Sequence, residues 1–243
     1  MIIVQLMRDA WFLVKAEYGG LRYKYFISLI MIGYFSFFGT AITGDLFTET
    51  SKNGSEYVFQ DFFFLSIIPV LGFIYTRKSM NYIREDSYTT SLARMRCMPI
   101  SFNAIMTGRI LQLIVAMLIN GCIFFVVQYL MIDGLKFQLS LSMFASFSLT
   151  WMGYGLIISG LYIYVELSAS GKQYLLFTCI FMAVTIAFSI GCKMLNWSVM
   201  RSSLEMTNTM PILTPLVVWV VGAISLYASF IAVRHRLAYR DLM

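Results

Sequence analysis

The stretch ILQLIVAMLINGCIFFVVQYLMI, residues 110–132, contains no charged side chain. An α-helix rises about 1.5 Å per residue, so this stretch is long enough to cross the hydrocarbon core of a bilayer, which is about 30 Å thick. Ordinary soluble domains do not contain apolar runs of this length. The stretch therefore predicts a transmembrane helix.

Five further runs of similar length and low charge occur on either side of it. They are residues 25–44, 57–76, 139–165, 173–192 and 212–233. The whole chain of 243 residues is 59% hydrophobic and only 12% charged, which excludes an ordinary water-soluble fold. We predict an all-α integral membrane protein with six transmembrane helices in a single domain, residues 1–243.

The orientation of these helices follows from the distribution of basic residues. All but four of the 18 Lys and Arg residues fall in segments on one side of the predicted membrane. The four exceptions are Lys52, Lys136, Lys193 and Arg201. Basic residues accumulate on the cytoplasmic side of membrane proteins, so both termini and the loop 77–109 are expected in the cytoplasm. The same distribution argues against a nucleic-acid partner, because the basic residues flank apolar runs and form no stripe.

The segment before the first predicted span, residues 1–24, has the pattern of an amphipathic helix. Its apolar residues recur at three-four spacing: Val4, Met7, Trp11, Val14 and Tyr18. We expect an elbow helix that lies along the inner membrane surface and contacts membrane lipids.

Several kinds of chemistry are excluded or disfavoured. No G-x-x-x-x-G-K-[ST] motif occurs, so the chain lacks a P-loop for ATP hydrolysis, and its single histidine, His235, offers neither a catalytic triad nor a metal site. Ion-coupled carriers usually place acidic residues near the membrane midplane. Here Asp61, Asp133 and Glu166 lie near the ends of the predicted spans. We expect a chain that is not an enzyme, without cofactor or metal.

Polar and small residues within the spans are of two kinds. Gln112, Asn120 and Gln128 are spaced by eight residues, which turns each by about 80° on a helix, so they form no single stripe. They suit interhelical hydrogen bonds, and Asn120 and Gln128, with Tyr34 and Phe38 of the first span, are the candidates for a substrate pathway. Small residues at intervals of four or five predict close helix packing: Ser142, Ser146 and Thr150, followed by Gly155 and Ser159.

The loop 77–109 is longer than a turn requires and carries a helical pattern. Tyr88, Leu92 and Met95 fall on one helical face, with Glu85 and Asp86 near its start and Arg94 and Arg96 near its end, an order that favours the helix dipole. Pro99 ends this helix, and Ser101 is a good N-cap for the helix that continues into the third span. A short helix beneath the membrane is predicted.

With these features the chain resembles the permeases of ABC-2 type exporters over nearly its whole length. The resemblance rests on the elbow, the six spans, the loop running into Met98-Pro99-Ile100-Ser101, and Arg109 at the head of the third span. The outer segment 193–211 is similar to the re-entrant helices that this family places between its last two spans.

This resemblance implies a transport subunit that works with a second permease, as a homodimer or heterodimer, and with separate ATPase subunits that hold ATP and Mg²⁺. The ATPase-coupling residues would be Arg84, Glu85, Asp86, Tyr88, Leu92, Met95, Arg96, Glu166 and Lys172. The outer gate would comprise Trp197, Met200 and Leu204. A bacterial cell membrane and export of an amphipathic peptide are expected. Polysaccharide, lipid and drug cargo stay open, and an ion-coupled or facilitative carrier is the alternative.

Overall fold

The computed structural model describes residues 2–19, 22–44, 54–73, 101–132 and 139–237, and all secondary structure in these ranges is helical. The helices are α1 (Ile2–Gly19), α2 (Arg22–Thr43), α3 (Gly54–Val70), α7 (Phe102–Met131), α9 (Leu141–Ser168), α10 (Gly171–Met194), α11 (Val199–Thr209) and α12 (Leu213–Leu237). The all-α prediction is confirmed.

Four of the helices are long and apolar enough to cross a membrane, judged by length and composition. They are Phe102–Met131, Leu141–Ser168, Gly171–Met194 and Leu213–Arg236. These match the last four predicted spans. Within the described residues, the first two predicted spans correspond to apolar stretches of fewer than 18 residues, Ile27–Thr43 of the 22-residue α2 and Tyr57–Val70 of the 17-residue α3. The chain is thus a helical membrane protein, and the count of six spans stays a prediction.

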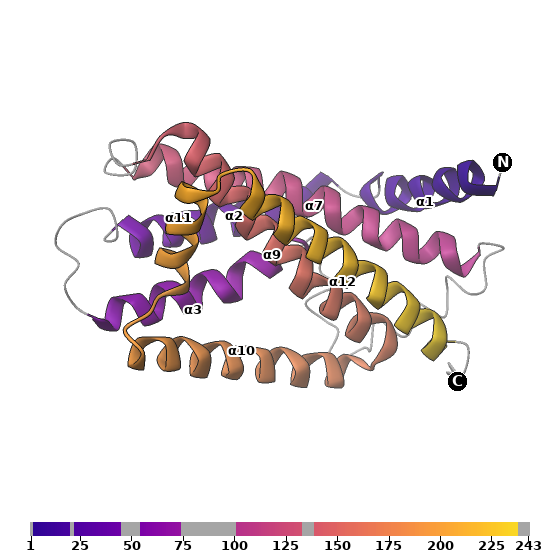
Figure 1. Ribbon diagram of the computed structural model, residues 1–243. Helices are drawn as coiled ribbons and strands as arrows, with labels where there is room; N and C mark the ends of the chain where they lie inside the picture. Colours follow the sequence, from indigo (N-terminus) through magenta and orange to yellow (C-terminus); the bar gives the residue numbers. More distant parts are fainter. Residues whose placement is uncertain (1, 20–21, 45–53, 74–100, 133–138, 238–243) are drawn as a thin grey trace.

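The second span was predicted over residues 57–76, but the helix α3 ends earlier, at Val70. Pro69 lies in the last turn of α3 and has no N–H to donate to the carbonyl of Leu65. The next three residues form a tight turn, in which Leu71 N donates to Ile68 O over 3.2 Å and Gly72 N donates to Pro69 O over 3.3 Å. Figure 1 shows α3 ending inside the bundle, and Leu71 there is fully buried.

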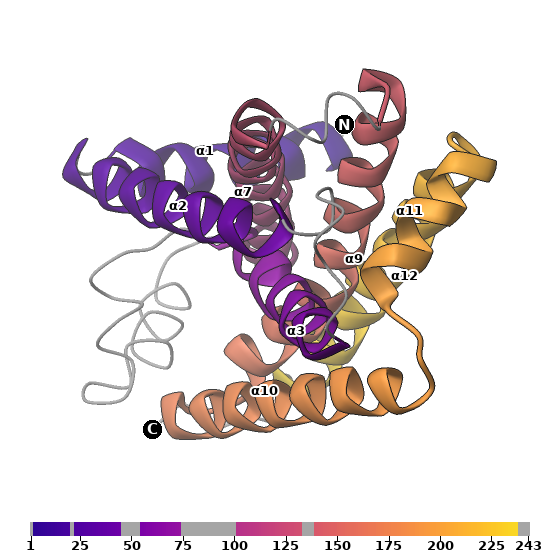
Figure 2. The ribbon, with the colours of Figure 1, turned by 90° about the vertical axis from the view of Figure 1, so that its left-hand side faces the viewer.

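The chain runs back and forth between two ends of the bundle (Figure 1). The start of α1 and the end of α12 lie at one end, which we call the terminal end. The start of α3 and the whole of α11 lie at the opposite end. Figure 2, viewed along the bundle, shows α7 and α9 near its centre and α10 at its edge.

Aromatic side chains of α3, α7 and α9 form the centre of the core. The Phe64 ring lies 5.1 Å from the Trp151 ring and 6.0 Å from the Phe124 ring, both edge to face. Phe147 packs 6.3 Å from the same Phe64 ring. Phe64 and Phe124 are fully buried, so this cluster joins three helices that are far apart in the sequence.

Small residues let α9 approach its neighbours closely. A Cβ on Gly155 would lie 2.5 Å from Met117 Cε of α7, and Ser159 donates to the carbonyl of Pro69 over 3.2 Å. The prediction of close helix packing is confirmed for Gly155 and Ser159, within one chain, whereas Ser142 at the start of the row is exposed. The sequence did not predict a second close contact of α9, which is with α12. There a Cβ on Gly160 would lie 2.6 Å from Ser225 Oγ.

The N-terminal segment is helical as predicted, and its position along the membrane surface stays a prediction. Ala10 and Val14 are buried, and a Cβ on Gly108 of α7 would lie 3.3 Å from Ala10 O. Met7 and Trp11 are exposed. The small Ala10 side chain determines the contact because it allows α1 to approach α7 closely.

Candidate functional site

The short helix α11 lies in the segment 193–211 and makes several specific hydrogen bonds to other helices. It follows a turn that closes α10, in which Asn196 has φ 52° and Trp197 N donates to Cys192 O over 3.0 Å. Asn tolerates this left-handed conformation better than most residues, and the bonding pattern satisfies the last carbonyls of α10. Ser198 then serves as the N-cap of α11.

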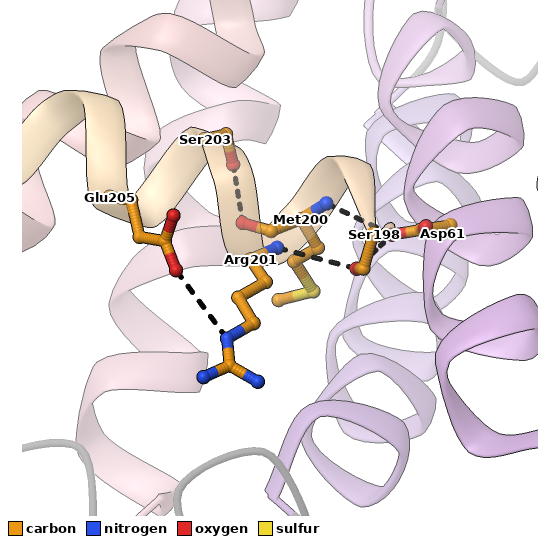
Figure 3. A network of polar contacts seen from close by, with 6 residues as sticks. All are labelled: Asp61, Ser198, Met200, Arg201, Ser203 and Glu205. Carbon is orange, nitrogen blue, oxygen red and sulfur yellow. Dashed lines mark hydrogen bonds and ion pairs between the residues drawn. The ribbon is translucent and has the colours of Figure 1, made fainter. Parts of the chain in front are cut away.

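Asp61 of α3 binds the start of α11 (Figure 3). Its Oδ1 accepts from Ser198 Oγ and from Met200 N, each over 2.9 Å, and its Oδ2 accepts from Val199 N over 2.9 Å. The first N–H groups of a helix have no partner within the helix and carry its positive dipole end. Asp61 is only 1% exposed, and the hydrogen bonds from these N–H groups offset the cost of burying its carboxylate.

Two further contacts fasten α11 to α9. Trp151 Nε1 donates to Ser203 Oγ over 3.1 Å, and Ser146 Oγ donates to the carbonyl of Pro211 just after α11. The pair Arg201 and Glu205, by contrast, lies at 3.5 Å on the exposed side of the helix. Helix α11 is thus attached at its start, middle and end to the long helices beneath it.

Polar side chains also surround the buried end of α3. The Tyr154 hydroxyl donates over 3.0 Å to the carbonyl of Leu65, the acceptor that Pro69 leaves without its helical donor. Asn120 Nδ2 donates to the carbonyl of Leu71 over 2.7 Å. A helix can end inside a membrane protein only where such donors replace water. The prediction that Asn120 is an interhelical hydrogen-bond partner is confirmed.

A partly buried ion pair joins α7 to α9 near the terminal end. Arg109 Nη2 donates to Glu166 Oε1, and Arg109 Nη1 donates to Gln112 Oε1 over 2.7 Å. The side chains of Arg109 and Glu166 are 26% and 5% exposed. Because each charge has the other beside it, the two helices are held in register.

The predicted outer-gate residues are divided between two elements. Met200 is buried in the first turn of α11, and Leu204 lies half-buried one turn later. Trp197 is 47% exposed and belongs to the turn that closes α10, so it does not share a helix face with the other two. The capping by Ser198 places the start of α11 after Trp197.

The predicted pathway residues lie in different surroundings. Tyr34 and Phe38 lie on the exposed side of α2 with ring centroids 5.6 Å apart. Asn120 and Gln128 are buried on α7. Gln128 Nε2 has no hydrogen-bond partner among the described residues, and a Cβ on Gly39 of α2 would lie 2.6 Å from it.

Most predicted coupling residues lie outside the described ranges: Arg84, Glu85, Asp86, Tyr88, Leu92, Met95 and Arg96. Glu166 belongs to the last turn of α9 instead of a loop, and Lys172 is exposed at the start of α10. The N-cap predicted at Ser101 is confirmed, since its hydroxyl accepts from Ala104 N over 3.3 Å.

Sequence reasoning missed the roles of Asp61 and of the ion pair. An acidic residue in an otherwise apolar run is a signal that it needs a partner, but nothing local identifies Ser198 as that partner. Within the described part of the chain, no group of three His, Cys, Asp or Glu side chains could hold a metal ion.

Comparison with known proteins returns no relative: no protein-family model, curated protein or solved structure matches this chain.

Proposed function

We propose that the chain is the membrane-spanning permease subunit of an ATP-driven exporter of the ABC-2 type. In this proposal it is no enzyme itself, pairs with a second permease, and is powered by separate ATPase subunits that bind ATP and Mg²⁺. Both termini and the loop 77–109 lie in the cytoplasm of a bacterial cell. The cargo is an amphipathic peptide or another amphiphile.

The observation that carries the proposal is the attachment of α11 to α3. A short helix between the last two long helices, capped by the buried Asp61, is the arrangement expected of a re-entrant element at the outer end of such a permease. The start of α1 and the end of α12 lie at the opposite end of the bundle (Figure 1), as six spans require. The basic residues Arg109, Lys172 and Arg234 belong to that terminal end, which supports its placement in the cytoplasm.

The mechanical part of the proposal concerns how movement would pass between the two ends. ATP-driven closure of the ATPases would push on the segment 77–109 and on the α9–α10 connection. Because Arg109 joins α7 to Glu166 of α9, and α9 packs along α12, these helices would move as one body. Helix α11 would follow through Trp151 and Asp61.

Copurification tests the proposal. The chain is purified in mild detergent from its native host, and bound proteins are identified by mass spectrometry and assayed for ATP hydrolysis. A stoichiometric P-loop ATPase is expected, and it should be lost when Glu85, Asp86 and Leu92 are replaced together. Recovery of the chain alone in several detergents would overturn the exporter assignment.

An ion-coupled carrier is the second candidate, and the end of α3 inside the bundle favours it, since interrupted helices bind ions in carriers. Against it, the carbonyls of Leu65 and Leu71 already accept from Tyr154 and Asn120, and Asp61 already accepts three hydrogen bonds. Purified chain in vesicles separates the two: a carrier transports under an imposed ion gradient without ATP.

A further inference from the structure

A pocket of about 860 Å³ opens at the terminal end of the bundle, where α9 ends, α10 begins and α12 ends. Its wall includes Tyr164, Ser168, Ser170, Gln173, His235 and Arg236. Among the described residues that line it, none is acidic. The pocket lies apart from α11 and from the Asp61 contact, which are at the opposite end.

The arginine in this pocket is positioned by an aromatic side chain. Arg236 Nη1 donates to the Tyr164 hydroxyl over 3.1 Å, and the guanidinium carbon lies 6.0 Å from the Tyr164 ring centroid. A guanidinium has five N–H donors in a planar fork that suits phosphate oxygens. Tyr164 therefore orients a cation at the pocket wall while leaving most of its donors for a ligand.

A buried hydroxyl without a partner lies in the same wall. Ser168 is 4% exposed, and its Oγ has no hydrogen-bond partner among the described residues. Buried hydroxyls are normally hydrogen-bonded, so this hydroxyl has the capacity to bond a polar group that enters the pocket.

The start of α10 adds a third favourable feature. Ser170 caps this 24-residue helix, and Ser170 N donates to Gln173 Oε1 over 3.1 Å. Both residues line the pocket, so the positive dipole end of α10 lies at its wall. An oriented guanidinium, a buried hydroxyl and a helix N-terminus together favour an anion with several acceptor oxygens, namely a phosphate group.

The surroundings identify the source of that phosphate. Beyond the pocket, the outward sides of α10 and α12 are apolar and exposed, with Leu176 at 60%, Tyr227 at 67% and Ile231 at 50%. These surfaces suit acyl chains, and the pocket lies at the polar end of both helices. We propose that the pocket binds the phosphate headgroup of an anionic phospholipid whose acyl chains lie along α10 and α12. This needs only a membrane location and does not depend on exporter activity.

Lipid binding by the purified full chain tests the inference. Phosphatidylglycerol and phosphatidylcholine are titrated separately into detergent-solubilised protein, and bound lipid is counted by native mass spectrometry. One phosphatidylglycerol should bind in preference to phosphatidylcholine. Arg236→Gln should weaken its binding by at least about tenfold, because charge-assisted hydrogen bonds to the phosphate are lost.

The matched control is Arg234→Gln, which removes the same charge from the same exposed helix end but not from the pocket wall. It should weaken binding by less than about threefold. Ser168→Ala provides a second variant with no change in charge, and it should also weaken binding. Equal losses for the two arginine variants, or equal binding of the two lipids, would overturn the proposal. If inorganic phosphate binds as tightly as the lipid, the claim that the phosphate group belongs to a lipid would be overturned.

Discussion

Replacement of Asp61 by alanine should release the start of α11. Asp61 accepts three hydrogen bonds of 2.9 Å and is 1% exposed. Side-chain hydrogen bonds in membrane proteins contribute about 0.6 kcal/mol each on average and up to about 1.7, so the three together stabilise the attachment by about 2 to 5 kcal/mol. Even 2 kcal/mol would raise the population with α11 detached about 30-fold.

The thiol of Cys192 reports on this detachment. Cys192 is 4% exposed, and its carbonyl accepts from Leu195 N and Trp197 N in the turn that leads to α11. In a variant whose other three cysteines are changed to alanine, Asp61→Ala should increase the rate of labelling by a water-soluble maleimide at least about tenfold. The midpoint of thermal unfolding in detergent should fall as well.

Glu205 is the matched acidic control. It pairs with Arg201 at 3.5 Å, with both side chains about 70% exposed. Glu205→Gln should change stability by less than about 1 kcal/mol, because exposed ion pairs contribute little. Asp61→Asn should fall between the two, since its amide retains one acceptor oxygen but turns an N–H group towards Val199 N. Labelling and unfolding of Asp61→Ala that match those of Glu205→Gln would refute the reasoning.

Two further predictions concern contacts between long helices. Arg109→Gln and Glu166→Gln should each lower the unfolding midpoint, because each removes one side of this ion pair, and the double variant should recover part of the loss with a coupling energy of at least about 1 kcal/mol. Lys172→Gln is the exposed control for that cycle, and additive effects would argue against the pair. Gly160→Ala should destabilise the bundle by about 1 to 3 kcal/mol, because its Cβ would lie 3.2 Å from backbone atoms of α12. A Cβ on Gly33 would have no atom within 4 Å, so Gly33→Ala should be neutral or slightly stabilising. Equal unfolding midpoints for the two glycine variants would contradict the close packing at Gly160.

The class of the protein and most of its helices could be predicted from the sequence. A run such as residues 110–132 has no charged side chain, and the cost of leaving backbone polar groups unpaired in a bilayer makes it a helix whatever surrounds it. The N-cap at Ser101 and the interhelical role of Asn120 were also predictable, since the first needs only local spacing and the second only a polar group among apolar ones.

What only the tertiary structure decided is which distant residues meet. Asp61 and Ser198 are 137 positions apart, and Arg109 and Glu166 are 57 positions apart. Hydropathy determines that each segment lies in the membrane. Hydropathy does not determine which helix faces pack together, because lipid is as apolar as the helix surfaces. That choice rests on a few polar groups and close glycine contacts, and their geometry exists only once the helices are packed.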